Sequence, residues 1–86
     1  MNIWELTILR IIEENKGTAP LQQIYSRIPS YIDLSSHHLE ITFNAPNYHH
    51  QTRAHVDDLL DSADVTRVGR GVYSITQKGR KRIVEK

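Results

Sequence analysis

DVTRVGRGVYSITQKGRKRI, residues 64–83, is the stretch of sequence that decides the fold. Two short runs of β-branched and aromatic residues, Val65–Val68 and Val72–Ile75, stand on either side of a glycine-arginine-glycine triplet. Such runs favour strands, and a two-residue connection at Gly69-Arg70, with glycine first, fits a type II′ hairpin turn. Thr76 then caps a helix that we expect over residues 77–84. The stretch therefore predicts a hairpin that leads directly into a final helix.

Three helices are predicted before this hairpin, because apolar residues recur there at helical spacing. The first runs over residues 3–16 and stops at Gly17. A brief strand at residues 18–19 and then Pro20, which suits a helix start, lead into the second helix over residues 21–28. The third begins at His49 or His50 and runs to about Ser62.

The third helix is expected to bury one face and to end at Asp64, since aspartate tolerates the left-handed backbone conformation. Its inner face would carry Val56, Leu59, Leu60 and Ala63. Before it, residues 34–40 predict one or two helical turns, with Ser36 as the cap and Glu40 near the capping-box offset. Residues 42–47 have turn chemistry and are expected to form a loop.

The chain is short and contains no cysteine. Its 86 residues are enough for one small domain, residues 1–86, but too few for a cleft enzyme with separate binding and catalytic layers. Disulfides and cysteine-rich zinc sites are excluded. No run has the features of a signal peptide or a membrane span, so we expect a cytoplasmic protein.

The charge of the chain is unevenly distributed. Residues 1–52 hold three cations against five anions, whereas residues 65–86 hold seven cations against Glu85 alone. Clustered cations are typical of a face that binds a polyanion, because they displace the counterions that condense on phosphates. A solvated basic helix is the alternative explanation.

The predicted order of elements is that of an α+β winged helix-turn-helix, with a three-helix core, a two-stranded β-hairpin wing and a C-terminal helix. In that fold the third helix enters the major groove of double-stranded DNA and the wing lies on the backbone or in the minor groove. Such a protein would be associated with the nucleoid when bound. The expected DNA-binding residues are His49, His50, Gln51, Thr52 and Arg53 at the third helix, and Arg67, Arg70, Lys78, Arg80 and Lys81 on phosphates.

The same helix also carries acidic residues that phosphates would repel. Asp57, Asp58 and Asp61 follow one turn after the basic part. We therefore expect only the first turn and a half of the helix to enter the groove. The alternative is that the helix is merely amphipathic.

No catalytic, metal or cofactor site is predicted. His37-His38 and His49-His50 are adjacent pairs whose side chains diverge on a helix, and His55 has no second histidine four residues away. The sequence also lacks a cysteine nucleophile, a glycine-rich phosphate loop and an HExxH motif, and its aspartates are expected to be a solvated helix face. We expect a binding domain and not an enzyme, with no cofactor.

Several motifs together resemble one family. They are LSSHHL (residues 34–39), a loop of about ten residues, an arginine-bearing helix ending in DDLLDSADV, and RGVYSIT (residues 70–76). This combination is similar to the N-terminal winged-helix domain of Mrr-type restriction endonucleases, which recognise modified DNA. The resemblance implies that Gln51 and Arg53 lie at the DNA and Arg70 in the wing. It also implies a separate nuclease domain, so the chain would be a recognition module of a larger nuclease or a stand-alone relative.

Other roles remain open at the level of sequence. A winged-helix transcriptional regulator would share the DNA contacts, and a repressor homodimer would need a symmetric site. A protein-interaction or dimerisation winged helix would barely touch DNA, and the acidic third helix favours it. A pocket for a modified base would need aromatic walls, for which Tyr31, Phe43 and Tyr48 are the candidates.

Overall fold

The hairpin expected from residues 65–75 is present and forms two strands of a three-stranded antiparallel sheet. In the computed structural model, which describes residues 2–85, β4 (Val65–Gly69) pairs with β5 (Val72–Ile75). β1 (Thr18–Pro20) pairs with the other edge of β5, in the register Ala19 opposite Tyr73, so the strand order is β1-β5-β4. The short strand after the first helix is thereby confirmed, one residue longer than expected.

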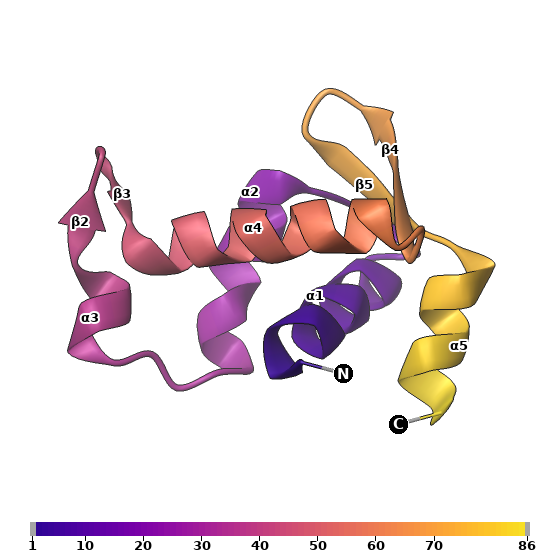
Figure 1. Ribbon diagram of the computed structural model, residues 1–86, viewed down its shortest axis with the longest axis horizontal. Coiled ribbons are helices and arrows are strands. Elements are labelled where there is room, and N and C mark those ends of the chain that lie inside the picture. Colours follow the sequence, from indigo (N-terminus) through magenta and orange to yellow (C-terminus); the bar gives the residue numbers. More distant parts are fainter. Residues whose placement is uncertain (1, 86) are drawn as a thin grey trace.

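Five helices surround this sheet in the described part of the chain. They are α1 (Ile3–Glu14), α2 (Leu21–Arg27), α3 (Ser36–Leu39), α4 (Asn47–Asp61) and α5 (Gln77–Glu85), with a 3-10 turn at Ile28–Ser30 after α2. Figure 1 shows α4 running along the length of the molecule, with the β4–β5 hairpin rising above its C-terminal part and α5 descending from the same end, beside α1. The chain is a compact α+β fold.

The core is built around α1. Ile8, Leu9, Ile11 and Ile12 are completely buried, because α1 is covered by α2, α4, α5 and the sheet. The helix ends at Glu14, two residues earlier than expected. Lys16 and Gly17 both have positive φ, and the Gly17 amide donates to the Ile12 carbonyl at 3.0 Å, which closes the helix with a left-handed cap.

The end of α4 differs from the prediction. Ala63 takes the left-handed conformation, with φ of 64°, and is exposed, whereas Asp64 is fully buried. The Asp64 amide donates to the Leu59 carbonyl at 3.0 Å, which completes the cap, and its carbonyl accepts from the Thr76 amide at 3.0 Å. The left-handed residue is therefore Ala63, one position before the expected Asp64, and the Asp64 carboxylate is buried.

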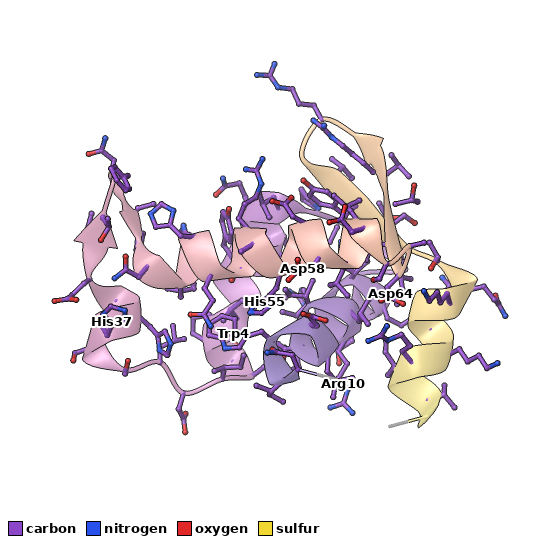
Figure 2. The ribbon with its side chains drawn as sticks, in the orientation of Figure 1. Trp4, Arg10, His37, His55, Asp58 and Asp64 are labelled. Carbon is purple, nitrogen blue, oxygen red and sulfur yellow. The ribbon has the colours of Figure 1, made fainter. Side chains whose placement is uncertain are left out.

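Asp64 and Thr76 join the end of α4 to the start of α5. The Thr76 hydroxyl accepts from the Gly79 amide at 3.1 Å, as a helix cap does, and also lies 2.7 Å from the Ala63 carbonyl oxygen. A Cβ atom at Gly79 would lie 2.3 Å from the Asp64 carbonyl oxygen. Glycine at this position therefore lets α5 approach the α4–β4 junction, which Figure 2 shows at the label Asp64.

The segment between α2 and α4 contains a second hairpin where a loop was expected. β2 (Ile41–Thr42) pairs with β3 (Ala45–Pro46) around Phe43 and Asn44, both of which have positive φ. The pattern was hard to detect because each strand has only two residues. α3 is present, but its N-cap is Ser35 and not Ser36, and His38 takes the place expected for Glu40 in the capping box.

The turn of the β4–β5 hairpin also differs from the expected type II′ geometry. Gly69 pairs with Val72, so the two loop residues are Arg70 and Gly71. Positive φ occurs at Gly71, the second loop residue, with a value of 67°, and not at Arg70. A register shift between Arg67 and Gly69 moves the turn by one residue.

Among residues 2–85, no helix combines the length and the apolar character needed to cross a bilayer.

We expect Gly79→Ala to destabilise the protein although alanine favours helices. The added methyl group meets backbone, which cannot rotate away, and overpacking of this kind costs about 2–3 kcal/mol. Urea denaturation measures the change. Gly69→Ala is the matched control, because its Cβ would meet only the Val72 side chain at 3.8 Å. Equal stability of the two variants would contradict the close approach of α5.

Candidate nucleic-acid interface

The helix expected to read DNA, α4, starts two residues earlier than predicted and presents only some of the expected side chains. His50 and Arg53 are exposed, and Gln51 is half-buried. Thr52 is completely buried, and its hydroxyl donates to the Tyr48 carbonyl at 2.6 Å. Thr52 therefore belongs to the inner face of α4 with Val56 and Leu59, and it is not available to a ligand. The expectation that Thr52 binds DNA is therefore wrong.

His49 is turned toward α2. Its ring stacks on Tyr25, with centroids 4.1 Å apart and planes 8° from parallel, and Tyr48 contacts it edge-on. Burial lowers the pKa of His49, and the neighbouring His50 lowers it further. The imidazole therefore favours its neutral form, so His49 helps to hold α4 against α2 and offers no cation to a phosphate.

Arg53 lies on the same side of α4. Burial raises the pKa of the Tyr25 phenol, and the nearby positive charge of Arg53 opposes that shift. Because Arg53 itself is exposed, its guanidinium can reach a ligand while its neighbours are held by α2. Of the five residues of this helix expected to bind DNA, His50 and Arg53 are the ones whose side chains are exposed.

The β4–β5 hairpin carries two exposed arginines. Arg70 occupies the first loop position, and Arg67 lies on β4, where its Nε donates to the Gly69 carbonyl at 3.3 Å. That bond leads the Arg67 side chain along the strand toward the turn. The hairpin thus concentrates positive charge at its tip, as expected from the glycine-arginine-glycine triplet.

The cations of α5 form a separate group, and two of them are paired with acids of the same chain. Arg80 lies 2.9 Å from Glu13 of α1, and Arg82 lies 3.0 Å from the buried carboxylate of Asp64. The Lys78 ammonium donates to the Ser62 carbonyl at 2.5 Å, whereas Lys81 is exposed. Figure 1 shows α5 beside α1 and pointing away from the hairpin tip. Among the described residues, the cations of α5 therefore do not form one face with α4.

Acidic side chains occupy the second half of the outer face of α4. Asp57, Asp58 and Asp61 are all exposed, as the sequence indicated. Their charges lie between the basic start of α4 and the hairpin, so a polyanion could approach closely only at the two ends of this surface.

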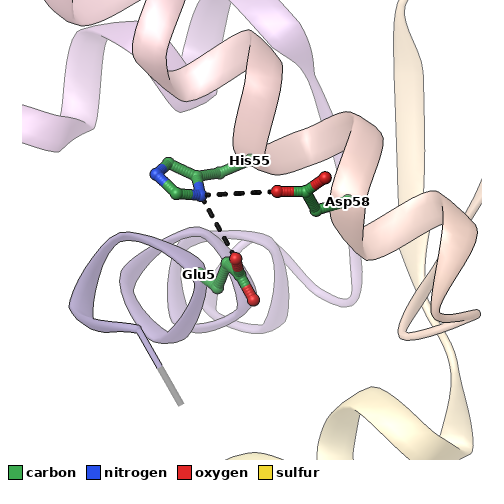
Figure 3. Close-up of side chains that lie close together, drawn as sticks. All are labelled: Glu5, His55 and Asp58. Carbon is green, nitrogen blue, oxygen red and sulfur yellow. Dashed lines mark hydrogen bonds and ion pairs between the residues drawn. The ribbon is translucent and has the colours of Figure 1, made fainter.

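One of these aspartates belongs to a mixed cluster that sequence reasoning missed. His55 Nδ1 lies 3.2 Å from Glu5 Oε2 of α1 and 3.9 Å from Asp58 Oδ2 (Figure 3). The spacing of His55 and Asp58, three residues apart on a helix, was a signal in the sequence. No signal in the sequence pointed to Glu5, because only the packing of α1 against α4 brings it next to His55. A histidine nitrogen and two carboxylates are donors that could hold a metal ion.

The three aromatic residues considered for a modified-base pocket lie apart. The Tyr31 hydroxyl donates a hydrogen bond to Glu14 of α1, and Tyr48 contacts His49. Phe43 contacts His50 edge-on at the tip of the β2–β3 hairpin. In the described part of the chain, no ring contact joins any two of the three. They do not form a preformed aromatic cage.

We expect Arg82→Ala to be much more destabilising than Arg80→Ala. Removing Arg82 leaves a fully buried carboxylate without its cation, which costs about 3 kcal/mol. The Arg80–Glu13 pair is substantially exposed, so its loss costs less than about 1 kcal/mol. Chemical denaturation of both variants at neutral pH tests the difference. A similar, small loss in both would mean that Asp64 does not depend on Arg82.

The lowered pKa of His49 predicts an acid-side loss of stability. The unfolded chain takes up a proton near the ordinary histidine pKa, whereas the folded chain resists it until a lower pH. The free energy of unfolding should therefore fall as the pH drops below about 6.5. His49→Phe keeps a ring for stacking on Tyr25, so denaturation at pH 5, 6 and 7 should show a flatter slope for this variant. An unchanged slope would contradict the burial of His49.

No family model, no curated protein and no solved structure matches this chain.

Proposed function

We propose that this chain is a winged-helix domain that binds double-stranded DNA through the first half of α4 and the β4–β5 hairpin. The observation that carries the proposal is the connection of the elements. α1, β1 and α2 precede α4, which leads directly into β4 and β5, and β1 pairs with β5. This is the arrangement in which a third core helix and an adjacent hairpin approach DNA together. On this interpretation, α3 and the β2–β3 hairpin are an insertion between the second and third core helices.

The proposed contacts divide into positioning and reading. Arg70 and Arg67 at the hairpin would bind phosphate oxygens, or Arg70 would enter a narrow minor groove. Arg53 would contact a base edge, since a guanidinium can bind guanine through two hydrogen bonds, with His50 and Gln51 beside it.

The acidic half of α4 limits how the helix could lie on DNA. Phosphates close to Asp57 and Asp61 would be repelled, so the helix would enter the groove with its first turns only. Lys78, Arg80 and Lys81 lie on α5, away from this surface, and are not part of the proposed interface. Arg80 is moreover engaged with Glu13. The interface is therefore smaller than the charge of the C-terminal region suggested.

We propose a restriction system, or a related defence against foreign DNA, as the setting for this domain, with modified bases as its specific ligand. The support is the resemblance of LSSHHL and RGVYSIT to Mrr-type domains. Phe43 is the aromatic side chain best placed to stack on an unpaired base, since it is 89% exposed at the tip of the β2–β3 hairpin. Its backbone has φ of 52°, which is unusual for a bulky residue.

Self-association is the second candidate function, and a specific observation favours it. Leu39, Ile41 and Phe43 are 55%, 71% and 89% exposed and lie close together at α3 and the β2–β3 hairpin. Several large apolar side chains exposed within one short segment are a common feature of protein interfaces. A homodimer formed through this surface could also be a transcriptional regulator that reads a symmetric DNA site.

The test is a fluorescence-anisotropy titration of unmodified and cytosine- or adenine-modified duplexes at two salt concentrations. We expect salt-sensitive binding that is tighter for a modified duplex. Arg70→Ala should weaken binding to every duplex and lower the slope of log K against log salt by about one. Arg53→Ala should instead change the preference among duplexes.

Lys81→Ala is the matched control for Arg70→Ala, because it removes the same charge from an exposed site on α5. We expect it to retain most of the affinity. Equal losses in the two variants would contradict the proposed interface. No binding at low salt, together with a concentration-dependent dimer in sedimentation, would replace DNA binding by self-association.

A further inference from the structure

Glu5, His55 and Asp58 come together where α1 crosses α4, outside the proposed DNA interface. Each residue contributes one donor atom, and the three donor atoms lie within 4.8 Å of one another. A divalent ion bound tetrahedrally at its usual distance of about 2.0–2.1 Å holds two ligands about 3.3 Å apart. The pair His55 Nδ1 and Glu5 Oε2, at 3.2 Å, already meets that spacing. Asp58 would need to move inward by rotation of an exposed side chain.

The surroundings hold two of the three donors in place. The side chains of His55 and Glu5 are only 18% and 19% exposed, whereas that of Asp58 is 66% exposed and leaves an opening to solvent. The His55 ring stacks on Trp4, with centroids 6.2 Å apart and planes 16° from parallel, so Nδ1 is directed at the two carboxylates. Figure 3 shows these two carboxylates approaching the same ring nitrogen from α1 and from α4.

We propose that Glu5, His55 and Asp58 form a binding site for a transition-metal divalent cation such as Zn²⁺. One imidazole nitrogen with two carboxylate oxygens suits zinc and its neighbours in the first transition series, whereas Mg²⁺ and Ca²⁺ prefer oxygen ligands alone. Water would complete the coordination on the open side, next to Asp58. The ion would bind the ring nitrogen His55 Nδ1 and one oxygen of each carboxylate, balance the two negative charges, and link α1 to α4.

Trp4 gives this site its own optical reporter. It is the one tryptophan of the chain and lies against His55. The experiment titrates the untagged, chelator-treated protein with Co²⁺ while tryptophan fluorescence is recorded, and with Zn²⁺ while the melting temperature is recorded. We expect saturable quenching at one ion per chain, and a rise in Tm on the order of 10 °C when Zn²⁺ exceeds its Kd a hundredfold. No DNA is present, so the result is independent of the proposed function.

Conservative variants distinguish metal binding at this site from metal binding at other histidines. Glu5→Gln and Asp58→Asn keep size and polarity, and each should weaken Zn²⁺ binding by about tenfold or more. Two control variants should bind Zn²⁺ as the unsubstituted protein does. Asp61→Asn removes an equal charge from the same helix, and His50→Gln removes an exposed histidine. The proposal is overturned if both Glu5→Gln and Asp58→Asn retain the original affinity, or if His50→Gln abolishes the quenching. Absence of any response to either ion would also overturn it and leave the trio as a hydrogen-bonded contact between helices.

Discussion

The buried carboxylate of Asp64 is the interaction on which the arrangement of the molecule depends. Its Oδ2 accepts from the Ser62 hydroxyl at 2.6 Å and lies 3.0 Å from Arg82, while its backbone binds Leu59 on one side and Thr76 on the other. Asp64 therefore lies between the end of α4 and the start of β4 and anchors α5. A charge taken out of water must be compensated by partners nearby, so the three elements are held in one relative orientation.

This junction also determines which cations remain on the surface. Arg82 compensates Asp64, and Arg80 on the same helix pairs with Glu13 of α1. α5 thus uses part of its positive charge to attach itself to the core. The hairpin arginines lie outside this network, at the far side of the junction, which is why a strongly basic C-terminal sequence yields two separate basic regions.

Aromatic and histidine rings hold α4 on both of its sides. His49 stacks on Tyr25 of α2, and His55 stacks on Trp4 of α1. The two histidines are six residues apart and project to opposite flanks of the helix, so α4 is fixed about its own axis. As a result, Arg53 is presented on the α2 side, and the Glu5–His55–Asp58 trio lies on the α1 side. Two further histidines also contact aromatic rings, since His38 lies against Trp4 and His50 against Phe43.

The sequence by itself determined the order of the main elements, because that order depends on local patterns. Apolar periodicity indicated α1, α2 and α4, β-branched runs indicated β4 and β5, and Thr76 with Gly79 indicated a capped α5. Exposed Arg53 and Arg70 were also foreseeable from their local settings. Only the tertiary structure decided the burial of Thr52 and Asp64, the pairing of Arg80 and Arg82, and the approach of Glu5 to His55. Each of these depends on a partner far along the chain, and local patterns carry no information on which distant charge or ring a side chain will meet.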